Sequence, residues 1–278
     1  MSAIDEMKID CHNHILDPLR YPYAADTRYR PSAQEVGTEH QLHTVCDAYG
    51  VAHCLVVGPN SGYGPDNRCL LDAIGRSNGR FKGIAVVPNV ADLEALADLK
   101  QRGIVGVAIN ATYHGTSYYR DTHALIDRLA ELDMFLQVQV EGDQLIDLLP
   151  LLQACRSKIL IDHCGRPLVA AGLAQPGFAA LLSLAANGRT AVKISGLSKF
   201  AKTEFPYNDT WPYVHALVDA FSPDMCMWGS DWPFLRATER LDYGPLLSLV
   251  DKLFPSAPVR RKILWDSPQR LFKFDTAN

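Results

Sequence analysis

Two histidines near the N-terminus are the first residues whose types and spacing could do chemistry. They lie in the run Asp10-Cys11-His12-Asn13-His14, which follows a short apolar lead and is typical of the end of a strand. Side chains two positions apart in a strand point to the same face, so we expect His12 and His14 to project together with Asp10 below them. Two adjacent imidazoles can hold a divalent metal or polarise an oxygen. A pair of solvated histidines is the alternative interpretation.

Two later runs also place a candidate catalytic residue at the end of an apolar segment. Residues 225–228 are apolar and are followed by Gly-Ser-Asp-Trp-Pro, which delivers Asp231 at the exit of a predicted strand. Residues 158–161 lead in the same way into Asp-His-Cys-Gly-Arg-Pro, which delivers His163. The alternative interpretation of His163 is a histidine of the core whose ring nitrogens have hydrogen-bond partners there. Together with His12 and His14, these residues are the candidate catalytic groups.

The elements that must position these groups alternate regularly between strand and helix. The first strand ends at residue 14, and further strands are expected at 53–57, 81–87, 104–110, 134–140, 158–162, 190–195 and 225–228. Ser32 and Glu35 form a capping box that predicts a helix from there to Tyr49. Further helices are expected at 67–77, 92–102, 122–132, 143–154, 177–186, 211–221 and 243–253, with short pieces at 259–266 and 268–272.

The character of the strands decides the fold class. Near-continuous apolar runs indicate strands buried on both faces, hence a parallel sheet covered by helices. Eight such units predict an α/β protein with one distorted (β/α)8 TIM barrel as a single domain over residues 1–278. A doubly wound open sheet is the alternative, but no glycine-rich phosphate fingerprint follows the first strand.

Active sites of such barrels lie at the carboxyl ends of the strands, where further polar residues are expected. The candidate substrate-binding residues there are Ser61, Asn110, Tyr113, Arg166, Lys193 and Arg236. Ser61 could instead serve a turn or packing. Lys193 stands within a buried strand, so it must face the barrel interior near the mouth or pair with an acid, because burying it unpaired is costly.

Composition excludes several classes of partner. The chain has 278 residues, 47% of them hydrophobic, and a net charge of −4 without basic clusters, which argues against nucleic acid and anionic membranes. No apolar run reaches about 18 residues, so no membrane span is expected. The start lacks the pattern of a signal peptide, and the seven scattered cysteines form no C-x-x-C pair, which favours a reducing cytoplasm. We expect a monomer or small homo-oligomer.

At this point the motifs resemble a known family. The Asp-Cys-His-Asn-His start, the run 162–167, the Lys-Ile-Ser-Gly-Leu run 193–197 and the Trp-Gly-Ser-Asp-Trp-Pro run 228–233 occur in an order similar to that of the amidohydrolase superfamily. The tail 263–272 also resembles its C-terminal signature, with Ser267 where Asn is common. The resemblance covers essentially the whole chain. It is strongest to the lactonase branch, which includes 2-pyrone-4,6-dicarboxylate lactonase and sugar lactonases, and implies a small lactone substrate. By position, His12, His14, His163 and Asp231 match active-site residues.

One departure from the family pattern concerns the substrate. Relatives that act on the pyrone dicarboxylate resemble Gly-x-Arg-x-Asn in the fourth strand, whereas this chain has Ala108 at the arginine position. Arginine binds a carboxylate bidentately, so its loss weakens the case for a dicarboxylate. A lactone with one carboxylate, or a neutral sugar lactone, is then equally expected. Arg120, Arg166, Lys199 and Arg236 could supply one anion site.

The resemblance implies hydrolysis of a cyclic ester. Asp231 would take a proton from water and return it to the leaving oxygen, while His12, His14 and His163 stabilise the developing oxyanion. The same four residues could hold one zinc or manganese ion that supplies hydroxide. Fully metal-dependent members resemble a site with further histidines and a bridging Lys or Glu, whereas this chain offers Gln137, Gln139, Ala108 and Asn110 at those strands. We therefore expect no obligatory metal.

Two other functions compete with this interpretation. The first is a metal-dependent decarboxylase of an aromatic or unsaturated acid, because that branch shares the His-x-His start and the late Asp. The second is a barrel without catalytic activity that serves in binding or assembly. The retention of three histidines, Lys193 and Asp231 at the barrel mouth argues against the second.

Overall fold

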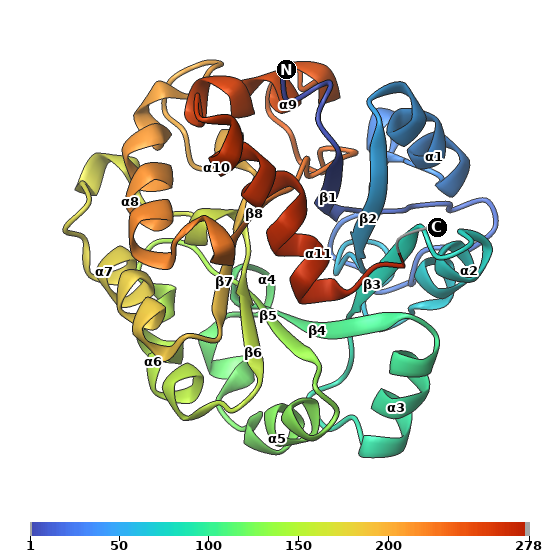
Figure 1. Cartoon of the computed structure of the whole chain (residues 1–278). Helices are drawn as coiled ribbons and strands as arrows, with labels where there is room; N and C mark the ends of the chain where they lie inside the picture. The colour runs from blue at the N-terminus through green and yellow to red at the C-terminus, as the bar shows by residue number, and fades with distance from the viewer. Residues whose placement is uncertain (1, 276–278) are drawn as a thin grey trace.

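Eight parallel strands form a barrel in the computed structural model, which describes residues 2–275 (Figure 1). The strands pair in chain order, and β1 approaches β8 through a bridge between Asn13 and Trp232 that nearly closes the barrel. Their bounds are β1 Lys8–Asn13, β2 Val51–Val57, β3 Phe81–Ala85, β4 Ile104–Asn110, β5 Phe135–Gln139, β6 Lys158–Ile161, β7 Thr190–Ile194 and β8 Cys226–Trp228. The predicted α/β barrel is therefore confirmed.

Helices surround the barrel and bury the outer faces of the strands (Figure 1). They are α1 Glu39–Ala48, α2 Arg68–Arg76, α3 Leu93–Gln101, α4 Ala111–His114, α5 His123–Glu131, α6 Gln144–Ala154, α7 Pro176–Ser183, α8 Trp211–Phe221, α9 Tyr243–Leu253, α10 Ala257–Arg261 and α11 Ser267–Phe272. Because helices cover the outer faces and side chains fill the inside, the strands are apolar on both faces, as their sequences indicate.

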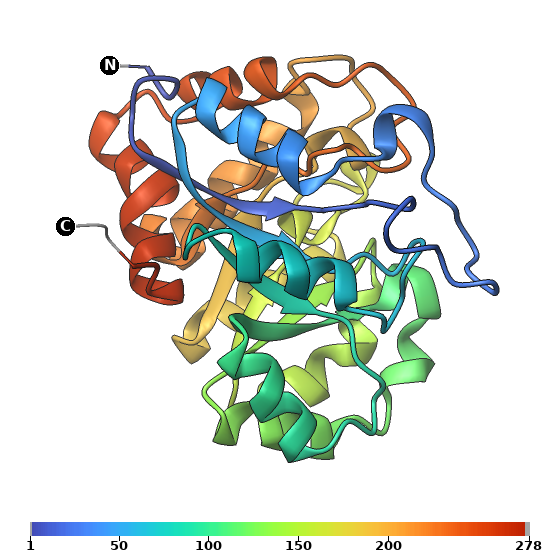
Figure 2. The same cartoon turned by 90° about the vertical axis from the view of Figure 1, so that its right-hand side faces the viewer.

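The interior of the barrel is a packed core that is closed at one end. Apolar side chains from the strands, among them Ile9, Leu55 and Met227, form a cluster with Phe272 of α11 and Phe274. Figure 2 shows α11 at the amino ends of the strands, opposite the long loop that follows β1. The carboxyl ends of the strands are therefore the end at which a site can form.

One predicted helix is shorter than its capping box suggested. The Ser32 and Glu35 contacts stabilise only a 3₁₀ turn, Ala33–Glu35, and α1 begins after Thr38, whose side chain accepts a hydrogen bond from the Gln41 amide. Between them lies Gly37, where an added Cβ would collide with the ring of Trp232. A tertiary contact with the segment after β8 thus interrupts the helix predicted from residue 32.

All seven cysteines are free and buried, without a disulfide. Among the residues that the structure describes, no helix combines the length and the apolar character required to span a bilayer.

Candidate active site

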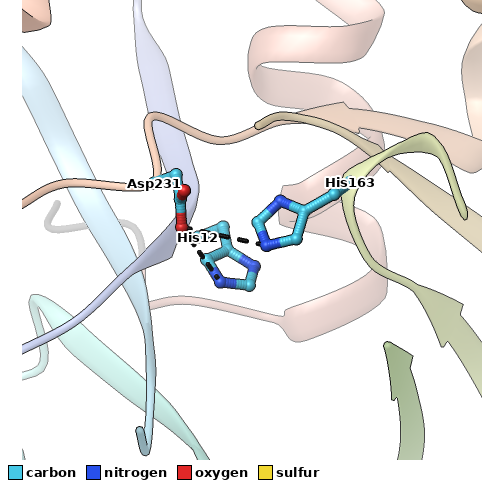
Figure 3. Close-up of side chains that lie close together, drawn as sticks. All are labelled: His12, His163 and Asp231. Carbon is cyan, nitrogen blue, oxygen red and sulfur yellow. Dashed lines mark ion pairs between the residues drawn. The ribbon is translucent and has the colours of Figure 1, made fainter. Parts of the chain in front are cut away.

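Three imidazoles surround one carboxylate at the carboxyl ends of the strands. The Nε2 atoms of His12, His14 and His163 lie 3.7, 3.6 and 3.8 Å from Oδ1 of Asp231. Figure 3 shows His12 and His163 directed toward Asp231, each from a different segment of the chain. All four side chains are buried or nearly so. The structure thus brings together the four predicted catalytic groups.

Strand β1 positions two of the histidines through an irregularity in its pairing. Its register against β2 shifts between Asp10 and Asn13, so simple alternation does not hold there. His12 and His14 still project together, with ring centroids 5.0 Å apart. Asp10, however, does not lie below them. Its carboxylate accepts hydrogen bonds from the Ser230 hydroxyl at 2.6 Å and the Tyr243 hydroxyl at 3.1 Å, which corrects the predicted orientation.

The second ring nitrogen of each histidine has its own partner. The carbonyl oxygen of Val57 accepts from His14 Nδ1 at 2.8 Å, so His14 carries its proton on Nδ1 and its Nε2 lone pair faces Asp231. His12 Nδ1 lies 3.1 Å from the Asp162 carboxylate, which accepts, and 3.2 Å from Nζ of Lys193, which donates, so His12 can adopt either tautomer. The Ser195 hydroxyl lies 2.9 Å from His163 Nδ1 and can donate or accept, so His163 can adopt either tautomer.

A buried charged network lies behind His12. Lys193 is fully buried, and its Nζ lies 3.1 Å from Asp162 Oδ1 and 2.5 Å from the Gln137 side-chain oxygen that accepts from it. Burial acts to raise the pKa of Asp162, but the charge of Lys193 and the contact with His12 outweigh it and hold that pKa well below the usual range. Lys193 therefore pairs with an acid, and that acid is Asp162, where Asp10 or Asp231 was expected. Lys193 does not line the cavity described below.

Lys199 contacts Asp231 directly. The sequence had suggested Lys199 only as one of several residues that could bind an anionic group of the substrate. Its Nζ lies 2.9 Å from Asp231 Oδ2, on the carboxylate oxygen opposite the histidines, and donates to the Leu235 carbonyl at 3.1 Å. Burial acts to raise the pKa of Asp231, but Lys199 and then His163 hold it well below its ordinary value. Asp231 is therefore ionised at neutral pH.

His12 and His163 are neutral in this setting. Burial lowers the pKa of His12 to about 4 and lowers the pKa of His163 well below its ordinary value, in spite of nearby carboxylates. The ionised Asp231 and the Nε2 lone pair of His14 are acceptors, and His12 and His163 can present either a lone pair or a proton to the same point. Such a set binds a species that carries protons to donate or positive charge, which is a water molecule or a metal cation.

A backbone feature shared by three residues helps direct them into the site. His163, Arg166 and Asp231 have φ values of 49°, 45° and 63°, in the left-handed region that residues other than glycine rarely adopt. Such conformations cost on the order of 1–3 kcal/mol each and concentrate at functional sites. Here they turn the chain sharply at the exits of β6 and β8. The local sequence contained no pattern that predicted these backbone conformations.

A cavity of about 340 Å³ opens directly over these groups. Its lining includes His14, His163, Asp231 and Lys199, together with five of the six predicted substrate-binding residues, namely Ser61, Asn110, Tyr113, Arg166 and Arg236. Arg166 forms an ion pair with Glu141 at 2.9 Å, and the Arg236 guanidinium lies over the Tyr29 ring, 4.4 Å from its centroid. The cavity lining therefore holds three basic side chains, Arg166, Lys199 and Arg236, and three acidic ones, Glu141, Asp231 and Glu239.

The same residues fit a metal ion. Ligand atoms of His12, His163 and Asp231 lie within 4.8 Å of one another, and His14 lies outside this group. The Nδ1 partners Asp162 and Ser195 would orient the two imidazoles as outer contacts of metal ligands commonly do. One divalent cation, zinc or manganese, could thus bind here, and whether the reaction requires one stays a prediction.

A buried acid–base centre at the carboxyl ends of a (β/α)8 barrel defines a class of barrel enzymes. Comparison with known proteins identifies the family within that class. The amidohydrolase family model matches residues 9–274. The chain therefore belongs to the amidohydrolase family, which confirms the predicted resemblance.

Relatives within the family are named lactone hydrolases. The chain is 34% identical to the 4-sulfomuconolactone hydrolase of Rhizobium radiobacter, over 97% of this chain and 91% of that protein. It is 27% identical to the 2-pyrone-4,6-dicarboxylate hydrolase of Comamonas testosteroni, over 95% and 89%. The crystal structure of a probable 2-pyrone-4,6-dicarboxylic acid hydrolase from Acinetobacter baumannii superposes with a TM-score of 0.88 at 26% identity, covering 96% of this chain and 99% of that one.

The competing decarboxylase interpretation finds a more distant likeness. A manganese-bound dihydroxybenzoic acid decarboxylase from Polaromonas matches with a TM-score of 0.62 at 14% identity, covering 98% of each chain. At that identity the likeness shows the shared barrel fold alone.

Proposed function

We propose that this protein hydrolyses the ring ester of a small lactone that carries one anionic group. The observation that carries the proposal is the convergence of three Nε2 atoms on Oδ1 of Asp231, with Lys199 held against Oδ2. One carboxylate oxygen is thereby paired with a cation and the other faces the cavity. The names of the relatives support a lactone, and the two arginines in the cavity lining, Arg166 and Arg236, support an anionic substituent.

In this proposal the attacking water lies between Asp231 and the Nε2 atoms of His12 and His14. Asp231 accepts a proton as the water oxygen forms a bond to the lactone carbonyl carbon. The oxyanion is stabilised by His163, whose Nε2 proton is available when Ser195 donates to Nδ1, and by the ammonium of Lys199. The ring C–O bond then breaks, and Asp231 returns the proton to the leaving alkoxide, which produces an open hydroxy acid.

Arginines supply the anion site. Arg166 and Arg236 line the cavity, and a guanidinium binds a carboxylate through two parallel hydrogen bonds. Ser61, Asn110 and Tyr113 line the same cavity and would contact the ring. Should a metal bind to His12, His163 and Asp231, it would lower the pKa of water and polarise the carbonyl. We also infer a cytoplasmic location, which the seven free cysteines support, and a monomer or small homo-oligomer.

The test is the metal content of the purified protein together with its activity on a panel of carboxylated and sugar-derived lactones, before and after chelation. Hydrolysis that persists without metal supports direct catalysis by Asp231 and the histidines. Stoichiometric metal with hydrolysis lost on chelation supports a metal-dependent lactonase. Absence of lactone hydrolysis, combined with release of carbon dioxide from unsaturated acids, would overturn the proposal in favour of the decarboxylase.

A further inference from the structure

A second cavity of about 300 Å³ adjoins the active-site cavity on the side of β2, β3 and β4. Asn60, Ala108 and Tyr113 line both cavities, so the two share a boundary at these residues. The smallest of the three, Ala108, lies on β4, and its methyl group is the whole side chain at that point of the boundary. Ala108 therefore leaves more room at this boundary than a larger side chain would.

The walls of the second cavity are aromatic. Tyr63, His114, Tyr118 and Tyr119 line it in addition to Tyr113. The rings of His114 and Tyr118 stack with centroids 4.5 Å apart and an interplanar angle of 17°, and Tyr119 meets Tyr118 edge-on at 5.0 Å. Grouped rings of this kind favour a flat, apolar guest through offset or edge-to-face contacts.

The polar ends of the deepest tyrosines are already engaged. The buried Tyr63 accepts a hydrogen bond from the Asp17 amide at 2.9 Å, and the buried Tyr119 accepts one from the Asn110 amide at 2.9 Å. His114 is paired with the Asn60 side-chain oxygen at 3.3 Å. These residues therefore offer a guest mainly their rings.

Charge in the second cavity is balanced. Its charged lining residues are Arg28 and Asp26, whose formal charges cancel. The Arg28 guanidinium donates to the Tyr113 carbonyl at 2.8 Å and lies over the Tyr113 ring, 5.2 Å from its centroid. A second carboxylate on the substrate would thus meet a cation that is already engaged, with an acidic side chain nearby. The first cavity is lined by two arginines and a lysine beside three acidic side chains, so the two cavities differ in the number of cationic groups and in their aromatic walls, and not in net formal charge.

We propose that the second cavity binds an uncharged planar substituent of the substrate, so that the preferred lactone is anionic at one end and carries an aryl or conjugated group at the other. The inference rests on the proposed lactonase function for the ring that reacts. It assigns the anionic group to the cavity lined by Arg166 and Arg236, and the planar group to the aromatic cavity beyond Ala108.

The experiment compares two lactones that differ only in such a group, 5-oxotetrahydrofuran-3-carboxylate and its 2-phenyl derivative. Two quantities are measured for each, kcat/KM with the natural protein and the dissociation constant with the Asp231→Asn variant. We expect the phenyl group to improve both by about tenfold or more, because burying a ring of that size transfers a large apolar area from water.

Variants then locate the binding of the phenyl group. Ala108→Leu fills the boundary between the cavities and should bring kcat/KM and the dissociation constant of the two lactones to similar values. Tyr118→Ala removes one wall of the second cavity and should reduce the preference for the phenyl lactone, which keeps the test valid even if Ala108→Leu fails to fold. Phe205→Ala is the matched control, since Phe205 is an exposed aromatic residue that lines neither cavity, and it should retain the full preference.

The outcomes separate the two proposals. Equal values for both lactones with the natural protein, or a phenyl preference that survives both Ala108→Leu and Tyr118→Ala, would overturn the aromatic cavity as a substrate site. If neither lactone is hydrolysed but the phenyl compound still binds more tightly, and does so only when Ala108 is present, the lactonase proposal fails and the aromatic cavity stands.

Discussion

Lys199 places its ammonium 2.9 Å from Oδ2 of Asp231, whereas the histidines approach the other oxygen, Oδ1. The two oxygens of one carboxylate thus have different surroundings. Oδ2 is neutralised by a cation, and Oδ1 faces the three imidazoles and the cavity. A base arranged in this way stays ionised while one of its oxygens remains available to a proton, which is the property that general-base catalysis by Asp231 requires.

The first prediction concerns Asp231 itself. Asp231→Asn removes the proton acceptor while preserving the shape of the side chain. We expect kcat for lactone hydrolysis to fall by about 10²–10⁴-fold, the usual contribution of a general base. Substrate binding, measured by calorimetry, should change little.

Asp98→Asn is the control for this substitution, because Asp98 is an exposed carboxylate on α3 that pairs only with Arg102 one turn away. It should leave kcat unchanged. Turnover of the Asp231→Asn variant at the rate of the natural protein would contradict the assignment of the base.

The second prediction is a shift in pH dependence. Lys199 lowers the pKa of Asp231, so Lys199→Met should raise that pKa towards its ordinary value. Asp231 is then protonated at a higher pH as the solution is acidified. The acidic limb of the kcat/KM profile should therefore shift to higher pH. The measurement is the pH profile of the variant beside that of the natural protein.

Lys202→Met provides the comparison for Lys199→Met, since Lys202 is an exposed lysine three residues further along the chain. Its acidic limb should coincide with that of the natural protein. An unmoved limb in Lys199→Met would show that the lysine does not control ionisation of the base.

The third prediction concerns the buried pair Lys193–Asp162. Lys193→Met leaves the Asp162 carboxylate buried without its cation, and removing one partner of a buried pair costs about 3–5 kcal/mol of unfolding free energy. The double variant Lys193→Met/Asp162→Asn removes the orphaned charge and should recover a large part of that loss. Denaturant unfolding measures both.

Lys158 and Asp133 form the matching surface pair, with side chains 36% and 61% exposed. Lys158→Met should change the unfolding free energy by no more than about 1 kcal/mol, as for most exposed pairs. If Lys193→Met lowered the unfolding free energy as little as Lys158→Met does, the buried network behind His12 would have no structural importance.

The fourth prediction tests the anion site. The Nε atom of Arg166 is buried without a hydrogen-bond partner in the structure, and its Nη2 pairs with Glu141. Arg166→Met should raise KM for a carboxylated lactone by about 10–100-fold, the equivalent of a charge-assisted hydrogen bond, with kcat little changed. KM for a neutral sugar lactone should be unaffected.

Arg156→Met is a suitable control for Arg166→Met, because Arg156 is an exposed arginine whose ion pair with Asp127 lies outside the cavity. An equal rise in KM for carboxylated and neutral lactones in Arg166→Met would indicate general disruption of the cavity and not loss of an anion ligand.

The sequence by itself determined the barrel and the four groups at its centre. Apolar runs long enough for buried strands, repeated eight times with helices between them, leave few folds other than a barrel. In a barrel all strands end at one mouth, so residues that follow β1, β6 and β8 must meet there. His12, His14, His163 and Asp231 could therefore be grouped without coordinates, although they are far apart along the chain.

Only the tertiary structure decided which partner each polar group has. The register shift in β1 turns Asp10 to Ser230 and Tyr243, and Gly37 against Trp232 ends the helix expected from residue 32. Periodicity in a sequence reports which positions are buried, whereas partners depend on how distant segments pack once the barrel closes. For the same reason the contact of Lys199 with Asp231, and the second cavity that shares Ala108 with the first, became visible only in the folded chain.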